Sequence, residues 1–341
     1  MRKIKIITLA LIAIFTSNVI CGQSKKFEKF EKNTLKGTMF GVKNSVTNQE
    51  VIPAIYTFIG QCKSGKFVAT KDNFQGVVDT LNKIIIPFKY SFVSDYLQNR
   101  VFLKTTEKLA MADENGKILT PFIYDDVLGY NDGVIKVIIK NKLGYINNQG
   151  KTILECKFDD GEDCKGEFIV VYSKSWDSLG WEFVTKDKNG KIINREGIGS
   201  TTNSPIVFNT LGKLLYKGSN GEKIIIPENK KIAISDKASS TEMSSQYVII
   251  KSNGEKSKPI KFSDLEAKSH WILLKEEFQT GWEYGIMNYS GEIVLQPRFK
   301  SISEYKYNNY QYAKVEFKNN DFFYIDKNAN CVKFDNKNCP E

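Results

Sequence analysis

Few residues in this chain of 341 residues have the types and spacing that common catalytic mechanisms need. His270 is the single histidine, and the sequence contains neither a Gly-x-Ser-x-Gly nucleophile elbow nor a glycine-rich phosphate loop. A lone histidine next to Trp271 is more typical of a packing or surface position than of a general base. We therefore expect a protein that is not an enzyme and that uses no cofactor.

One acidic cluster lies between two cysteines, Cys156 and Cys164, and consists of Asp159, Asp160, Glu162 and Asp163. Carboxylates and backbone oxygens at this density can bind Ca²⁺, and a pair of carboxylates can hydrolyse glycosides. The spacing lacks the alternation of a known calcium loop, so a solvated turn is favoured and no metal site is predicted. A secreted hydrolase-like enzyme with loop carboxylates is the alternative.

The residues best suited to binding are tyrosines in the segment 303–315. Tyr305, Tyr307 and Tyr310 alternate with lysine, asparagine and glutamine, a mixture that can stack on sugars or peptides while supplying hydrogen bonds. Tyrosine offers a large contact area with little loss of entropy. Trp176, in an enlarged loop between two predicted strands, is the second candidate. The alternative is that these side chains only pack against the sheets.

The elements that position these residues come from an internal repeat, which the prolines mark. Six of the eight prolines occupy one repeat position, the first three at steps of 34 residues: Pro53, Pro87, Pro121, Pro227, Pro259 and Pro297. An aromatic residue follows three places later in several copies, as at Tyr56 and Tyr90. A fixed period of this length is typical of repeat architectures.

Each repeat unit is predicted to be a three-stranded antiparallel meander with a glycine turn between its last two strands. Turns at Gly116, Gly150 and Gly291 favour the positive φ that glycine adopts. Proline lacks the N–H that a sheet interior needs, so we expect it to end the unit. The aromatic residue that follows is expected to pack on the neighbouring unit.

These units predict an all-β fold with about eight repeats. The repeat domain is expected to span residues 38–341, after a signal peptide (1–22) and a linker (23–37). Its units should end near residues 53, 87, 121, 155, 195, 227, 259 and 297, with a partial unit at 321–334. Because the partial unit can complete a sheet begun by residues 38–53, a β-propeller-like ring is favoured over an open β-solenoid.

Three segments carry a resemblance to a known family: FQGVVDTLNKIIIPFKY (74–90), KLGYINNQGKTILECKF (142–158) and WEYGIMNYSGEIVLQPRF (282–299). Their order of glycine, hydrophobic strand, turn and proline-containing strand resembles the WG repeat family of bacterial β-repeat proteins, over most of residues 38–336. The Trp-Gly pair that gives the family its name is intact in no copy. The resemblance implies a β-repeat fold and no single activity.

The six cysteines, in a chain with an export signal, indicate an oxidising compartment. Seven residues separate Cys156 from Cys164, and seven separate Cys331 from Cys339. Each pair is predicted to form a local disulfide, which leaves Cys62 unpaired. A zinc site would need more closely spaced cysteines or more histidines.

The N-terminus predicts export, because three basic residues precede an uncharged apolar run at positions 6–20. We expect a periplasmic, extracellular or cell-surface protein with no integral membrane segment after signal cleavage. Lipidation of Cys21 is less favoured, since Ile20, rather than a small residue, precedes it.

Charge and composition restrict the partners. The net charge is +10, and loss of Arg2, Lys3 and Lys5 with the signal peptide lowers it by three to +7. Because the lysines form no concentrated stripe, nucleic acid is not expected as a partner. The leading hypothesis is a monomeric exported binding or scaffold protein whose partner is a protein, a glycan or a component of the bacterial cell envelope. A purely structural envelope protein is the other alternative.

Overall fold

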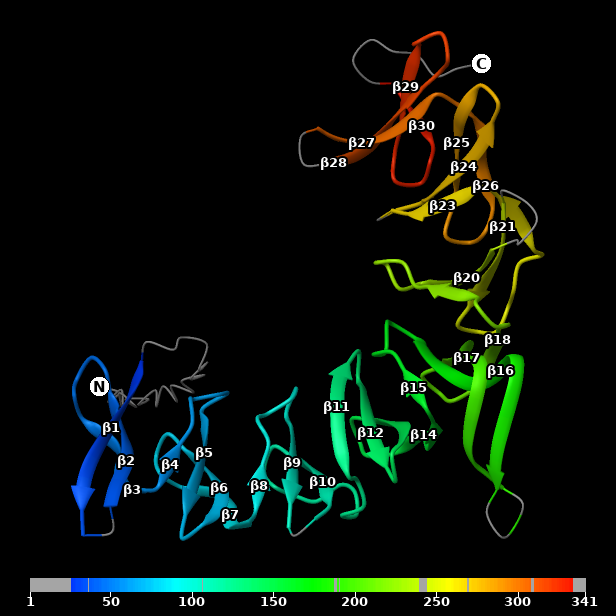
Figure 1. The fold of residues 1–341 in the computed structure, drawn as a ribbon. Helices are drawn as coiled ribbons and strands as arrows, with labels where there is room; N and C mark the ends of the chain where they lie inside the picture. Colours follow the sequence, from blue (N-terminus) through cyan, green and yellow to red (C-terminus); the bar gives the residue numbers. More distant parts are fainter. Residues whose placement is uncertain are drawn as a thin grey trace, which may run out of the picture. The chain divides into compact units, whose positions relative to one another are not determined.

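The fold comes from a computed structural model that describes residues 26–35, 37–105, 107–186, 189, 191–238, 244–268, 270–307 and 310–333. For residues 174–184, 186, 192–202, 305–307 and 310–311 only the backbone is described. All regular elements in these ranges are β-strands (Figure 1), which confirms the predicted all-β class. No helix of the described ranges is long and apolar enough to cross a membrane.

The strands form eight antiparallel sheets, as the repeat count predicts, and we number the sheets 1 to 8 in chain order. The chain divides into two compact units, of which the first ends at Ile123. Sheet 1 consists of β1 (Phe27–Thr34), β2 (Gly37–Asn44) and β3 (Glu50–Tyr56). Sheet 2 consists of β4 (Phe58–Ile59), β5 (Lys66–Lys71), β6 (Phe74–Asp79) and β7 (Ile84–Tyr90). Sheet 3 consists of β8 (Phe92–Val93), β9 (Arg100–Lys104) and β10 (Leu109–Asp113).

The second unit begins at Tyr124 and contains the other five sheets. Sheet 4 consists of β11 (Asp126–Asn131), β12 (Val134–Ile139), β13 (Lys142–Asn147) and β14 (Thr152–Phe158). Sheet 5 consists of β15 (Asp160–Gly161), β16 (Phe168–Lys186), β17 (Ile192–Asn209) and β18 (Leu214–Lys217), and sheet 6 of β19 (Lys223–Ile225), β20 (Ile232–Ala238), β21 (Ser245–Lys251) and β22 (Ile260–Phe262). Sheet 7 consists of β23 (Asp264–Ala267), β24 (Ile272–Phe278), β25 (Gly281–Met287) and β26 (Ile293–Phe299), and sheet 8 of β27 (Ser301–Tyr307), β28 (Tyr310–Glu316), β29 (Phe322–Ile325) and β30 (Cys331–Val332).

Six of the eight sheets have four strands instead of the three predicted for each unit. In sheet 2 the additional strand, β4, begins two residues after Tyr56 and pairs Phe58 with Thr70 and Ile59 with Ala69. Strands of two residues are too short to show any hydrophobic period in the sequence. The meander pattern itself is confirmed, because strand order follows chain order in every sheet.

Three of the repeat prolines lie inside the last strand of a sheet, whereas the sequence predicted that they would end it. Pro53 lies in β3, Pro87 in β7 and Pro297 in β26. Each of these strands is at the edge of its sheet, where the ladder tolerates a residue without an N–H. The strand therefore continues through the proline to, or close to, the aromatic residue.

A glycine of the preceding strand lies directly beneath this last strand. A Cβ atom added to Gly41 or Gly76 would lie 2.6 Å from the carbonyl oxygen of Ile52 or Ile86, and one at Gly285 would lie 2.5 Å from that of Leu295. The pairing register shifts beside each of these glycines, as in a β-bulge. The close approach of the two backbones, rather than an unusual φ, thus requires glycine here.

The predicted glycine turns are confirmed, with φ of +84° at both Gly116 and Gly150. In these turns, and in the equivalent turns with Asn82 or Ala329 in place of glycine, the first residue adds an Asx interaction, because its side chain accepts two backbone N–H groups. Asp79 Oδ1 accepts from Leu81 at 2.8 Å and from Lys83 at 2.9 Å. The same pair of bonds recurs at Asp113, Asn147, Asn209, Asn288 and Asp326.

The apolar core is divided among the junctions between successive sheets. Tyr56 at the end of β3 packs with Phe67 and Val78 of sheet 2, and its hydroxyl donates to Asn82 Oδ1 at 2.7 Å. Phe158 packs with Ile169 of sheet 5. The structure thus confirms that the aromatic residue after the repeat position packs on the next sheet of the same unit, and burial of apolar area at the junctions within each unit holds neighbouring sheets together.

The expected unit ends near 195 and 227 do not coincide with sheet ends. Arg195 lies inside β17, because β16 and β17 form a hairpin with strands of 19 and 18 residues. Residues 223–225 form β19, the first strand of sheet 6, so Pro227 does not occupy the repeat position. The described part of the predicted partial unit, residues 321–333, contributes β29 and β30 to sheet 8, which β27 and β28 complete.

The cysteines differ from the prediction. Cys156 and Cys164 are free thiols, because they lie on opposite sides of β13. The Cys156 sulfur lies against Gly144, whereas Cys164 packs with Leu143 and Tyr145, and neighbouring residues of a strand point to opposite faces. Burial raises the pKa of Cys164 to about 12.

Cys62, which we expected to be unpaired, is disulfide-bonded, and so is Cys331. Cys339 lies outside the described residues, so its pairing with Cys331 stays a prediction.

Candidate functional site

The three tyrosines predicted to bind a ligand lie on one hairpin of sheet 8. Tyr305 and Tyr307 belong to β27 and Tyr310 belongs to β28, and the register places Tyr305 opposite Tyr312 and Tyr307 opposite Tyr310. The side chains of Tyr305, Tyr307 and Tyr310 lie outside the described part of the structure. The backbone nevertheless brings all three into two cross-strand pairs, which the pair of Lys306 and Gln311 separates.

Described side chains continue this pattern along β28 and β29. The Nζ of Lys314 lies 4.2 Å from the centre of the Phe322 ring and 3.6 Å from Glu316 Oε2. The Phe322 and Tyr324 rings meet edge to face, with 5.6 Å between their centres. Sheet 8 therefore combines aromatic rings with a cation and a carboxylate, groups that can stack on a ligand and hydrogen-bond to it.

An open pocket of about 330 Å³ lies where sheets 7 and 8 meet. Its lining comes from the segment that leads into β24, from β24 itself and from β27: Lys268, Trp271, Leu273, Ile302, Ser303 and Glu304. Trp271 is buried, and its ring centre lies 6.0 Å from that of His270. The pocket thus places polar side chains and one indole ring beside sheet 8. Two of its lining residues, Ser303 and Glu304, directly precede Tyr305 in the chain.

Trp176 does not belong to this group. It lies in β16 opposite Thr201, so the predicted loop is a paired strand of the long hairpin in sheet 5. Its side chain lies outside the described part of the structure. The structure therefore places the two predicted ligand-binding elements on different sheets.

The acidic cluster at 159–163 joins sheet 4 to sheet 5 through ion pairs. Lys142 binds Asp159 at 2.5 Å, Lys136 binds Asp163 at 2.7 Å, and Lys165 binds Glu162 at 2.9 Å. Glu162 Oε1 also accepts the Tyr172 hydroxyl at 2.5 Å, and burial followed by this bond raises the pKa of Tyr172. In the part of the chain that the structure describes, no three His, Cys, Asp or Glu side chains are placed to hold a metal ion.

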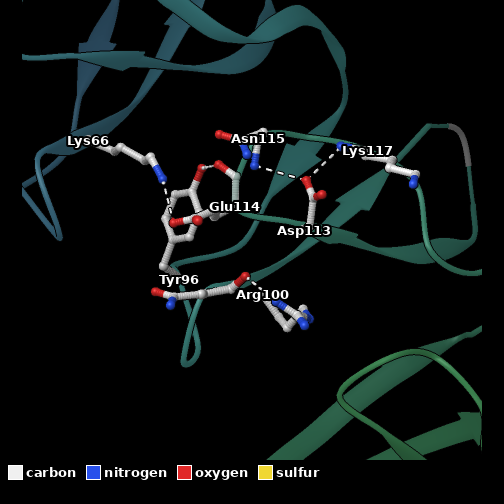
Figure 2. A network of polar contacts seen from close by, with 8 residues as sticks. Lys66, Tyr96, Arg100, Asp113, Glu114, Asn115 and Lys117 are labelled. Atoms are coloured by element: carbon white, nitrogen blue, oxygen red, sulfur yellow. Dashed lines mark hydrogen bonds and ion pairs between the residues drawn. The ribbon is translucent and has the colours of Figure 1, made fainter.

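Two polar clusters were not predicted from the sequence, and the first joins sheets 2 and 3. Lys66 Nζ lies 3.2 Å from Glu114 Oε2 and 5.0 Å from the centre of the Tyr96 ring, and the Tyr96 hydroxyl donates to the Glu114 carbonyl at 3.1 Å (Figure 2). Burial, followed by the charge of Glu114, raises the pKa of Tyr96. The three residues are scattered in sequence, so no local motif marks them.

The second cluster surrounds Glu222, which is only 4% exposed. Its carboxylate accepts the Ser219 backbone N–H at 2.7 Å, the Tyr216 hydroxyl at 2.5 Å and the Ser235 hydroxyl. Three donors compensate for the burial of this carboxylate. The cluster links β18, β20 and the loop that leads to β19, and it has the contacts of a structural element.

Comparisons with known proteins support the repeat. Four segments, residues 76–105, 111–142, 144–171 and 284–320, match the family model described as WG containing repeat. No curated protein matches the chain. Among solved structures, the crystal structure of a eukaryotic initiation factor is 10% identical with a TM-score of 0.30, over 90% of this chain and 94% of that chain. The structure of apo AztD from Citrobacter koseri is 9% identical with a TM-score of 0.27, over 80% and 96%. Neither likeness bears on function.

Proposed function

Because the chain belongs to the WG-containing repeat family, which it matches in four segments, we propose that it is an exported, non-enzymatic binding protein whose ligand contacts sheet 8. The observation that carries this proposal is the register of β27 and β28, which groups Tyr305, Tyr307 and Tyr310. Cross-strand tyrosine pairs present wide, stiff rings with polar ends. The ligand is a glycan or a protein segment, since both can use ring stacking together with hydrogen bonds.

A role without catalysis is supported by the state of the acidic residues. The carboxylates of the cluster at 159–163 are ion-paired or hydrogen-bonded within the chain, as at Asp159 and Glu162. Glu222 is engaged by three donors. An acid pair that hydrolyses glycosides must instead face a substrate across a cleft.

Export is supported by the basic and apolar N-terminal segment. In this proposal the mature protein acts in the periplasm, outside the cell or at the cell surface, as a monomer whose sheets present the ligand-binding hairpin.

The test replaces Tyr305, Tyr307 and Tyr310 by alanine together and measures binding to a glycan array and to biotinylated cell-envelope extracts. We expect loss of the bound signal with an unchanged thermal midpoint. The matched control is Phe74→Ala, which removes an aromatic residue of sheet 2 that is 48% exposed. Retained binding would show that the ligand does not contact these tyrosines. A thermal midpoint lowered by many degrees would show that they belong to the packing of the sheet.

A further inference from the structure

A pocket of about 480 Å³ lies at the junction of sheets 1 and 2, far in sequence from the hairpin of sheet 8. Its walls are mainly apolar and include Phe27 of β1, Phe58 and Ile59 of β4, and Phe67 of β5. Phe27 and Phe67 meet edge to face with 5.9 Å between ring centres. The volume lies within the range of pockets that hold small molecules, about 300–1,000 Å³.

The next junction has a different residue at the place of Cys62. Cys62 and Tyr96 occupy the same place in the repeat. Each directly precedes a β-bridge that closes a hairpin, Lys63↔Lys66 after Cys62 and Leu97↔Arg100 after Tyr96. Tyr96 packs into the core between sheets 2 and 3, where its hydroxyl binds Glu114 and Lys66 covers its ring (Figure 2). At the first junction Cys62, which is disulfide-bonded, lines the pocket at this place.

A cation occupies an unusual place in this pocket. Lys29 of β1 lies opposite Val42 in sheet 1. The equivalent pair of sheet 2 is Val68 and Val77, so that a valine stands in place of Lys29, and this valine packs in the apolar core. Lys29 Nζ lies 4.9 Å from the centre of the Phe40 ring. Among the described residues no carboxylate forms an ion pair with Lys29, although Lys32 and Lys43 in the same sheet both have one.

We propose that this pocket binds a small apolar carboxylic acid. The apolar body lies against Phe27, Phe58 and Phe67, where aromatic edges and faces contact it. The carboxylate pairs with Lys29, the one charged residue among the described residues that line the pocket. The proposal depends on neither the tyrosines of sheet 8 nor their ligand.

The experiment uses the mature protein and two probes of nearly equal size, 2-naphthoate and the uncharged 2-naphthalenemethanol, in isothermal titration calorimetry. We expect Phe58→Ala to weaken binding of both probes about tenfold, as the loss of part of a buried aromatic contact does. Lys29→Gln should weaken naphthoate about fivefold and leave the alcohol unchanged, the effect of a partly exposed ion pair.

The control is Phe92→Ala, because Phe92 corresponds to Phe58 in the next sheet, is 44% exposed and lies outside the pocket lining. It should bind both probes as the parent does. No measurable binding by the parent, equal binding by all variants, or an equal loss of both probes in Lys29→Gln would each overturn the proposal. Since Phe58 is 48% exposed, its truncation should leave the fold intact, and Lys29→Gln tests the charge independently.

Discussion

Sheets 2 and 3 are consecutive copies of one repeat, yet their last strands differ. In sheet 2, Gly76 lies beneath the last strand, β7, which pairs over seven residues. At the same repeat position, 34 residues later, sheet 3 has Ala110, and its last segment makes only the bridge between Ala112 and Ile118. Alanine at the crossing point thus coincides with a single bridge in place of a complete last strand.

The remaining sheets follow the same rule. Gly41, Gly144 and Gly285 each accompany a last strand of seven residues, namely β3, β14 and β26. Ile206 and Val248 stand at this position in sheets 5 and 6, where β18 has four residues and β22 has three. Every described last strand of seven residues is therefore accompanied by a glycine at this repeat position.

The largest effect should come from Gly76→Val, which places a side chain where a Cβ atom alone would lie 2.6 Å from the Ile86 carbonyl oxygen. We expect a loss of about 3 kcal/mol, the scale of overpacking in a tight core. Urea unfolding followed by circular dichroism measures this loss. Tryptophan fluorescence is less suitable, because all four tryptophans lie in the second unit and Gly76 lies in the first.

The matched variant is Ala110→Gly, which should cost only about 1 kcal/mol, the usual difference between alanine and glycine in a strand. Equal losses at the two positions would break the comparison.

A smaller effect is expected from Thr120→Val in sheet 3. Thr120 is buried, and its hydroxyl oxygen accepts the Met111 backbone N–H at 2.8 Å, in place of a strand ladder. Removing the acceptor leaves that buried N–H unpaired, at a cost of about 1–3 kcal/mol. Thr120→Ser retains the oxygen and should lose less. Thermal unfolding of both variants sharpens the comparison, which fails if serine and valine are equivalent.

The smallest effect concerns Tyr96, which holds sheet 3 to sheet 2. Tyr96→Phe should cost about 1 kcal/mol at pH 7, the value of one hydrogen bond. Because the pKa of Tyr96 is raised from its ordinary 10.0 in the folded state, its contribution is complete below pH 10 and is lost as the pH rises through the folded-state value. As the pH rises from 8 to 11, the urea midpoint of Tyr96→Phe should therefore fall less steeply than that of the parent protein. Parallel curves would contradict this assignment.

Much of the fold follows from the sequence, because the repeat places Gly116 and Gly150 at turns and Tyr56 and Phe158 at junctions. The fourth strands were not predictable, since two paired residues such as Phe58 and Ile59 leave no periodic signal. The register of sheets 5 and 6 was missed because the turn at Asn209 is followed by a strand without proline. Pro227 also follows a run of isoleucines, but that run belongs to β19, the first strand of sheet 6, rather than to a last strand.

The candidate site is a mixed case. The sequence singled out Tyr305, Tyr307 and Tyr310 as one group, but it did not predict the hairpin of β27 and β28 on which they lie. Trp176 was expected in a loop because an insertion lengthens the repeat there, but the added residues pair with each other. The pocket beside Lys29 was not predictable, because it depends on which side chains fill the space between two sheets.

The meander order of every sheet also has a consequence for folding kinetics. Each strand pairs with its neighbour in the chain, so the loops that must close are short and their entropic cost is small. Low contact order favours rapid folding for an all-β chain. Each sheet can form next to one already present, and hydrogen exchange should be graded along the chain rather than uniform.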